Sequence, residues 1–100
     1  MTFKCNGVEY EIKEVNIIED DSSNVGLTIY QEKTILLKKL DKDYMIKTLI
    51  HELIHVWLYE YGHNQTDKEF NNEDVCEIVA CSNTFINEVV EKYKEKINNK

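Results

Sequence analysis

The stretch that decides the fold is residues 41–62, which read DKDYMIKTLIHELIHVWLYEYG. Its apolar residues recur at intervals of three and four, as they do on one face of an α-helix. They are Ile46, Leu49, Ile50, Leu53, Val56 and Trp57. Asp41 is a residue type that caps helix N-termini, and Gly62 is one that ends helices. The pattern therefore predicts a helix over residues 41–62.

A second helix is predicted over residues 72–98, where apolar residues again recur every three or four positions. Asn71 or Asn72 would cap its N-terminus. The polar residues between the two helices predict a loop.

Residues 1–40 have the signature of β-hairpins. Asn6-Gly7 is a strong two-residue turn signal, and it precedes a stretch in which Val8, Tyr10 and Ile12 alternate with charged residues. Residues 27–30 and 34–37 flank a short polar turn and predict a second hairpin. We therefore expect one α+β domain, with a small antiparallel sheet of three or four strands beside two long helices.

Composition narrows the classes of partner. The chain has 100 residues, 12 basic and 19 acidic, and a net charge of −7, so it would repel nucleic acid. No apolar run is long enough to cross a membrane, and the N-terminal residues lack the apolar core of a signal peptide, which favours a cytoplasmic protein. Cys5, Cys76 and Cys81 form no C-x-x-C pair. We expect them to be reduced and buried thiols.

Within the first predicted helix stands an H-E-x-x-H motif, formed by His51, Glu52 and His55. Four residues are about one helical turn, so both imidazoles can ligate one zinc ion. A glutamate beside them can take a proton from metal-bound water and pass it to a leaving amine. Thr48 and Tyr59 share this polar face of the helix.

A zinc site of this kind needs a third protein ligand. Glu77, on the second predicted helix, is our first choice, because zinc sites of two histidines and one glutamate are known and the residues after Glu77 are small. His63 is the second candidate; it lies eight residues after His55, a spacing that excludes only the family with three histidine ligands. Glu73 is the remaining contender, although an acidic residue there also suits the helix dipole.

Two stretches carry a family resemblance: HELIHVWLYEYG at residues 51–62 and NEDVCEIVA at residues 72–80. Together they resemble the small phage and prophage metallopeptidases of gluzincin type, which are distantly related to the ImmA/IrrE peptidases. In those families an E-x-x-A on the following helix supplies the third zinc ligand, and residues 77–80 match it. The hairpin over residues 26–37 fits the strand that those families place before the zinc helix.

The motif and the resemblance together predict a zinc-dependent metallopeptidase with Glu52 as general base. Zn²⁺ would be held by His51, His55 and Glu77. A peptide or protein substrate could add as an extra strand, with residues 34–37 as the expected edge. The alternative is a non-catalytic or latent zinc-binding protein that regulates or binds a partner in a phage or mobile element. Nothing in the sequence indicates an oligomeric state.

Overall fold

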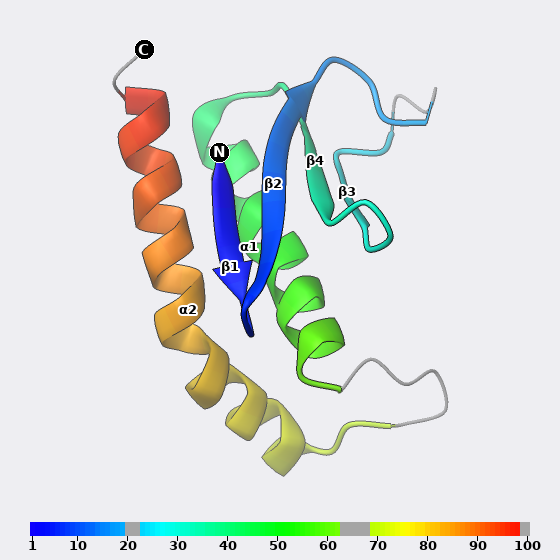
Figure 1. The fold of residues 1–100 in the computed structure, drawn as a ribbon, viewed down its shortest axis with the longest axis vertical. Helices are drawn as coiled ribbons and strands as arrows, with labels where there is room; N and C mark the ends of the chain where they lie inside the picture. Colours follow the sequence, from blue (N-terminus) through cyan, green and yellow to red (C-terminus); the bar gives the residue numbers. More distant parts are fainter. Residues whose placement is uncertain (20–22, 63–68, 99–100) are drawn as a thin grey trace.

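The computed structural model describes residues 1–19, 23–62 and 69–98. Within these ranges lie one four-stranded sheet and two helices: β1 (Thr2–Cys5), β2 (Val8–Val15), β3 (Gly26–Ile29), β4 (Thr34–Lys38), α1 (Lys42–Glu60) and α2 (Asn72–Asn98). In Figure 1, α1 lies behind the sheet and the longer α2 runs beside β1. The α+β fold with two long helices is confirmed.

The strands are arranged in the order β1-β2-β4-β3. The β1–β2 and β3–β4 pairs are antiparallel, as expected, whereas β2 and β4 are parallel, with Ile12 opposite Ile35. The sheet is therefore mixed. β4 has neighbours on both sides, which suits its run of apolar residues after Thr34. Because β4 has no free edge, the expectation that a peptide adds along residues 34–37 is wrong.

Side-chain hydrogen bonds begin both helices where the sequence predicts. Asp41 Oδ1 accepts from the backbone N–H of Tyr44 at 3.1 Å, so Asp41 is the N-cap of α1. Asn71 Oδ1 accepts from the N–H of Asp74 at 2.8 Å at the start of α2. Gly62 follows the end of α1 with φ of 77°, a left-handed conformation that favours glycine.

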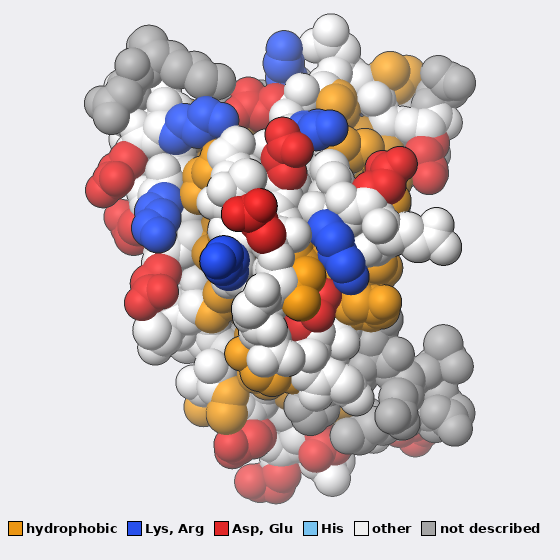
Figure 2. Space-filling view, in the orientation of Figure 1, with side chains coloured by type: hydrophobic (Ala, Val, Ile, Leu, Met, Phe, Trp, Pro, Cys, Tyr) orange, Lys and Arg blue, Asp and Glu red, His pale blue; other side chains and the backbone are white. Residues whose placement is uncertain are grey.

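The core lies between the sheet and the helices. Alternate residues of β1, β2 and β4 point toward α1, which buries Leu49, Leu53 and Val56 completely. Phe85 of α2 packs against Phe3 of β1, with ring centroids 5.9 Å apart. The opposite face of the sheet carries the alternating charged residues, and Figure 2 shows acidic and basic side chains intermixed over it. Neither helix in the described ranges is long and apolar enough to cross a membrane.

The three cysteines differ in burial. All are free thiols, but only Cys5 is buried, and burial raises its pKa to about 11. Cys76 and Cys81 are exposed, so the expectation that they are buried is wrong. They lie on the first half of α2, which extends past the end of the sheet (Figure 1). The fully buried residues of this helix begin only at Ser82.

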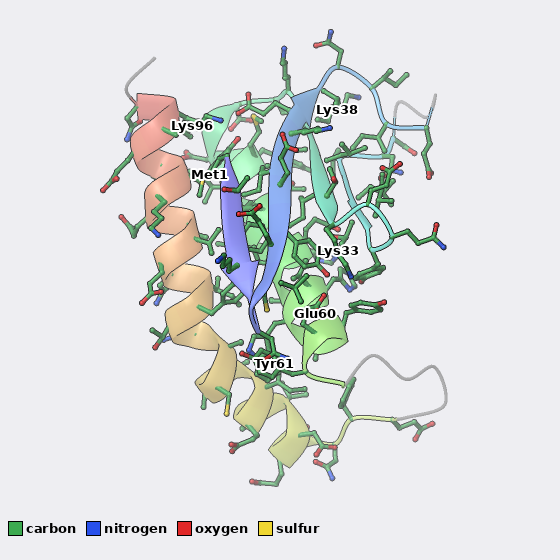
Figure 3. The ribbon with its side chains drawn as sticks, in the orientation of Figure 1. Met1, Lys33, Lys38, Glu60, Tyr61 and Lys96 are labelled. Carbon is green, nitrogen blue, oxygen red and sulfur yellow. The ribbon has the colours of Figure 1, made fainter. Side chains whose placement is uncertain are left out.

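The turn between β3 and β4 is fastened to the C-terminal end of α1. Lys33 Nζ lies 3.6 Å from Glu60 Oε2 and stands over the rings of Tyr59 and Tyr10, at 5.2 and 5.6 Å from their centroids. Figure 3 shows Lys33 on this turn beside Glu60. The Tyr10 hydroxyl also donates to Glu60. Burial and this hydrogen bond raise the pKa of Tyr10, which keeps the donor protonated.

The start of β3 lies directly against α1. A Cβ atom added to Gly26 would collide with Thr48 Cγ2 and come within 3.4 Å of Glu52 Cγ. Thr48 cannot easily turn away, because it is buried and its hydroxyl donates to the Tyr44 carbonyl at 2.9 Å. Gly26 is thus required by the close approach of strand and helix.

We expect Gly26→Ala to destabilise the protein by about 1–3 kcal/mol, the usual cost of overpacking a close contact. Thr48→Ser removes the colliding methyl group and keeps the hydroxyl. The cost of Gly26→Ala should therefore be much smaller in a Thr48→Ser background. Urea unfolding of the two single variants and the double variant measures this coupling. An equal cost in both backgrounds would contradict the proposed contact.

Candidate metal centre

Helix α1 brings the three motif residues together. His51 Nε2 and His55 Nε2 lie 3.1 Å apart, one helical turn from each other. With Glu52 they form a group whose potential ligand atoms all lie within 4.8 Å of one another. Among the described residues, these three side chains form a group that could bind a metal ion.

The histidine pair fits one ion. Two nitrogens bound at 2.0–2.1 Å to a tetrahedral ion lie roughly 3.3 Å apart. The 3.1 Å separation of His51 and His55 is close to this value. The His51 side chain is 70% exposed, so an ion can reach the pair from solvent. Donor type and spacing are therefore both suited to a borderline-soft divalent metal.

Glu52 differs from the two histidines because it is buried, with 7% of its surface exposed. Its Oε1 accepts a hydrogen bond of 2.8 Å from the Thr28 hydroxyl on β3. Its Oε2 lies 4.0 Å from His51 Nε2. The strand thus fixes the orientation of this carboxylate and leaves its second oxygen on the side of the histidines.

Residues on one face of β3 and its following turn build the rest of the site. Gly26, Thr28 and Tyr30 alternate along the chain, and the Tyr30 ring stacks on Tyr59 of α1 with centroids 4.3 Å apart. Burial, and then the charges of Glu52 and Tyr59, raise the pKa of Tyr30. Sequence reasoning missed these three residues. Their spacing of two could have indicated them, because residues two apart lie on the same face of a strand and these three are small or polar.

The candidates for a third ligand lie elsewhere. Glu77 is exposed on α2, and its Oε1 accepts from Cys81 Sγ at 3.2 Å. Glu73 is exposed in the first turn of the same helix. Neither belongs to the group formed by the motif residues. His63 lies outside the described residues. The role of Glu77 as a ligand stays a prediction.

A pocket of about 260 Å³ adjoins the motif. On the side of the sheet it is lined by Val25 and Gly26, and on the side of α1 it is lined by Tyr44, Lys47, Thr48 and His51. Glu52 also contributes to its wall. The candidate base and one candidate ligand therefore share a cavity large enough for a small side chain.

We expect His51→Ala and His55→Ala each to weaken zinc binding by at least about 100-fold, because each removes one direct ligand. Zinc titration followed by calorimetry measures the loss. Both side chains are exposed, so the variants should keep the fold, which circular dichroism verifies. Lys42→Ala, an exposed replacement on the same helix, is the control and should bind zinc normally. Stoichiometric, tight binding by the His51→Ala/His55→Ala double variant would refute this site.

Comparisons with protein-family models, with curated proteins and with solved structures each give no match for this chain. No relative therefore supplies a function or a ligand set. Function is therefore inferred from the geometry of His51, Glu52 and His55 and from the residues that hold them.

Proposed function

We propose that this chain is a zinc-dependent peptidase in which His51 and His55 hold the ion and Glu52 is the general base. One observation carries the proposal. A buried carboxylate, oriented by Thr28, faces two histidine nitrogens that are spaced to bind one ion. A helix gains nothing in stability from burying a carboxylate beside two exposed imidazoles, so a chemical role explains the arrangement better.

Zinc is the ion that suits these donors best. Imidazole nitrogens and a carboxylate are common zinc ligands, and catalytic zinc sites use three protein ligands and one open position. When bound, zinc polarises a peptide carbonyl and lowers the pKa of water. The residues of this chain would supply the ligands and the proton transfer.

The position of Glu52 supports a role as base. Two ligands of one ion lie roughly 3.3 Å apart, but Glu52 Oε2 is 4.0 Å from His51 Nε2. The Thr28 hydroxyl holds Oε1, so Oε2 is the oxygen that would take a proton from water. The same oxygen would then donate that proton to the leaving amine.

A peptide substrate would bind along β3. This strand is the edge of the sheet on the side where Thr28 contacts Glu52. An extended peptide that pairs with an edge strand presents its backbone at a fixed distance from that strand. β3 therefore replaces residues 34–37 as the proposed docking edge.

A non-catalytic zinc protein is the second candidate. Glu52 belongs to the same donor group as the two histidines, and a small shift of its side chain would make it a third ligand. Such a site would leave no free carboxylate to act as base, and it would stabilise the fold or a partner interface without hydrolysis. The two candidates assign different roles to one side chain, so they predict different effects of replacing it.

Glu52→Gln should keep zinc binding and lower peptide hydrolysis by about 10²–10⁴-fold, because the amide cannot accept the proton. The measurement is mass spectrometry of a random peptide library, with elemental analysis for zinc. A chelator should abolish cleavage by the wild type, and added zinc should restore it. Glu88→Gln, an exposed replacement on α2, is the control. Wild-type activity in Glu52→Gln would exclude the base role, and loss of zinc would favour Glu52 as a metal ligand.

The predicted third ligand is tested separately. If Glu77 completes the zinc site, Glu77→Gln should weaken zinc binding by at least about ten-fold. Glu73→Gln, one turn earlier on the same helix, removes the same charge and should have no effect. Calorimetric zinc titration compares the two variants. Equal affinities would rule out Glu77 as a ligand.

A further inference from the structure

The pocket beside the candidate metal centre has a cation at its wall. Lys47 lines it and is the only lysine or arginine among its described lining residues. Lys47 is exposed, and Glu52, which lines the same pocket, is buried. The pocket therefore has a positive group on its solvent side and a negative group in its interior.

Among the described residues, no neighbour forms an ion pair with Lys47. Asp43 precedes it by four residues, a spacing that allows an ion pair on a helix, but the described part of the chain forms no ion pair or hydrogen bond with the Lys47 side chain. The chain as a whole has a net charge of −7. Lys47 therefore attracts anions to this pocket, although the net negative charge of the chain repels them.

Lys47 lies within reach of a peptide residue bound next to His51. Lys47 is four residues before His51 on the same helix, so their backbone positions differ by about 6 Å along the axis. An extended peptide advances about 3.3–3.6 Å per residue. One such step and the length of a side chain together span this separation, so the residue next to the bond at His51 could place its terminal group at Lys47.

We propose that this pocket is a carboxylate subsite, in which Lys47 binds an acidic group on the substrate residue next to the cleaved bond. The group is a side-chain carboxylate or the C-terminal carboxylate of a short peptide. This inference rests on the proposed peptidase function and names its substrate class. Gly26 contributes by leaving the pocket wall on β3 free of a side chain.

The first experiment compares three peptides with zinc-loaded protein. One has glutamate next to a single cleavable bond and a C-terminal amide, and the second has glutamine in its place. The third has glutamine and a free C-terminal carboxylate. We expect kcat/KM to be about three- to five-fold higher with one or both carboxylates, as for a partly exposed ion pair. The glutamate and C-terminal peptides distinguish the two sources, and the preference should shrink in high salt.

Lys47 is then changed in two ways. Lys47→Gln should reduce the preference to about one, and Lys47→Glu should reverse it. Lys42→Gln is the matched control, because Lys42 is an exposed lysine on the same helix, about 140° around its axis from Lys47. An unchanged preference in Lys47→Glu would overturn the proposal, as would equal cleavage of all three peptides by the wild type.

A binding experiment separates this inference from the peptidase proposal. The glutamate and glutamine peptides are made with a reduced CH₂–NH bond at the cleavage position, so that no turnover is needed. Calorimetry should show that the wild type binds the glutamate analogue three- to five-fold more tightly, and that Lys47→Gln binds both equally. This result without hydrolysis of any peptide would refute the peptidase and keep the subsite. Hydrolysis without any difference in binding would refute the subsite and keep the peptidase.

Discussion

The close packing of β3 on α1 at Gly26 is the constraint on which the candidate site depends. Because Gly26 has no side chain, the strand backbone reaches the helix at Thr48 and Glu52. The Thr28 hydroxyl, two residues later on the same face, is then within hydrogen-bond distance of Glu52. A bulkier residue at position 26 would separate the two elements. The carboxylate would lose its partner, and the pocket beside it would change shape.

The other end of the β3–β4 hairpin is held by a different interaction. Lys33 joins the turn to Glu60, and Glu60 also accepts from Tyr10 of β2. The Lys33 side chain is 37% exposed and that of Glu60 is 10% exposed, and the hydrogen bond from Tyr10 satisfies the more buried partner. The hairpin is thus attached to the middle of α1, at Thr48 and Glu52, and to its C-terminal end at Glu60. His51 and His55 lie on the stretch of helix between Thr48 and Glu60. The strand that orients Glu52 and the helix that carries it therefore behave as one unit.

Local rules predicted the parts of the fold that depend on neighbours in sequence. The ends of α1, the Asn6-Gly7 turn and the pairing of His51 with His55 all follow from spacing and residue type within a few positions. The parallel pairing of β2 with β4 was missed, because it depends on how two hairpins dock. The Thr28–Glu52 and Lys33–Glu60 contacts were missed for the same reason, since each joins residues more than twenty positions apart.

The predicted third ligand shows where such local reasoning ends. Glu77 matches the E-x-x-A pattern, but a pattern within one helix says nothing about the distance between two helices. The half of α2 that carries Glu77 exposes Val75 and Val79 and contributes little to the core. Of the described residues of α2 before Ser82, Ile78 alone packs against the core, so fewer core residues fix this half than the half after Ser82. Core packing would fix the position of a metal ligand on the buried half. Glu77 lies on the exposed half, so its bond to the metal would itself have to hold this half of α2 close to α1.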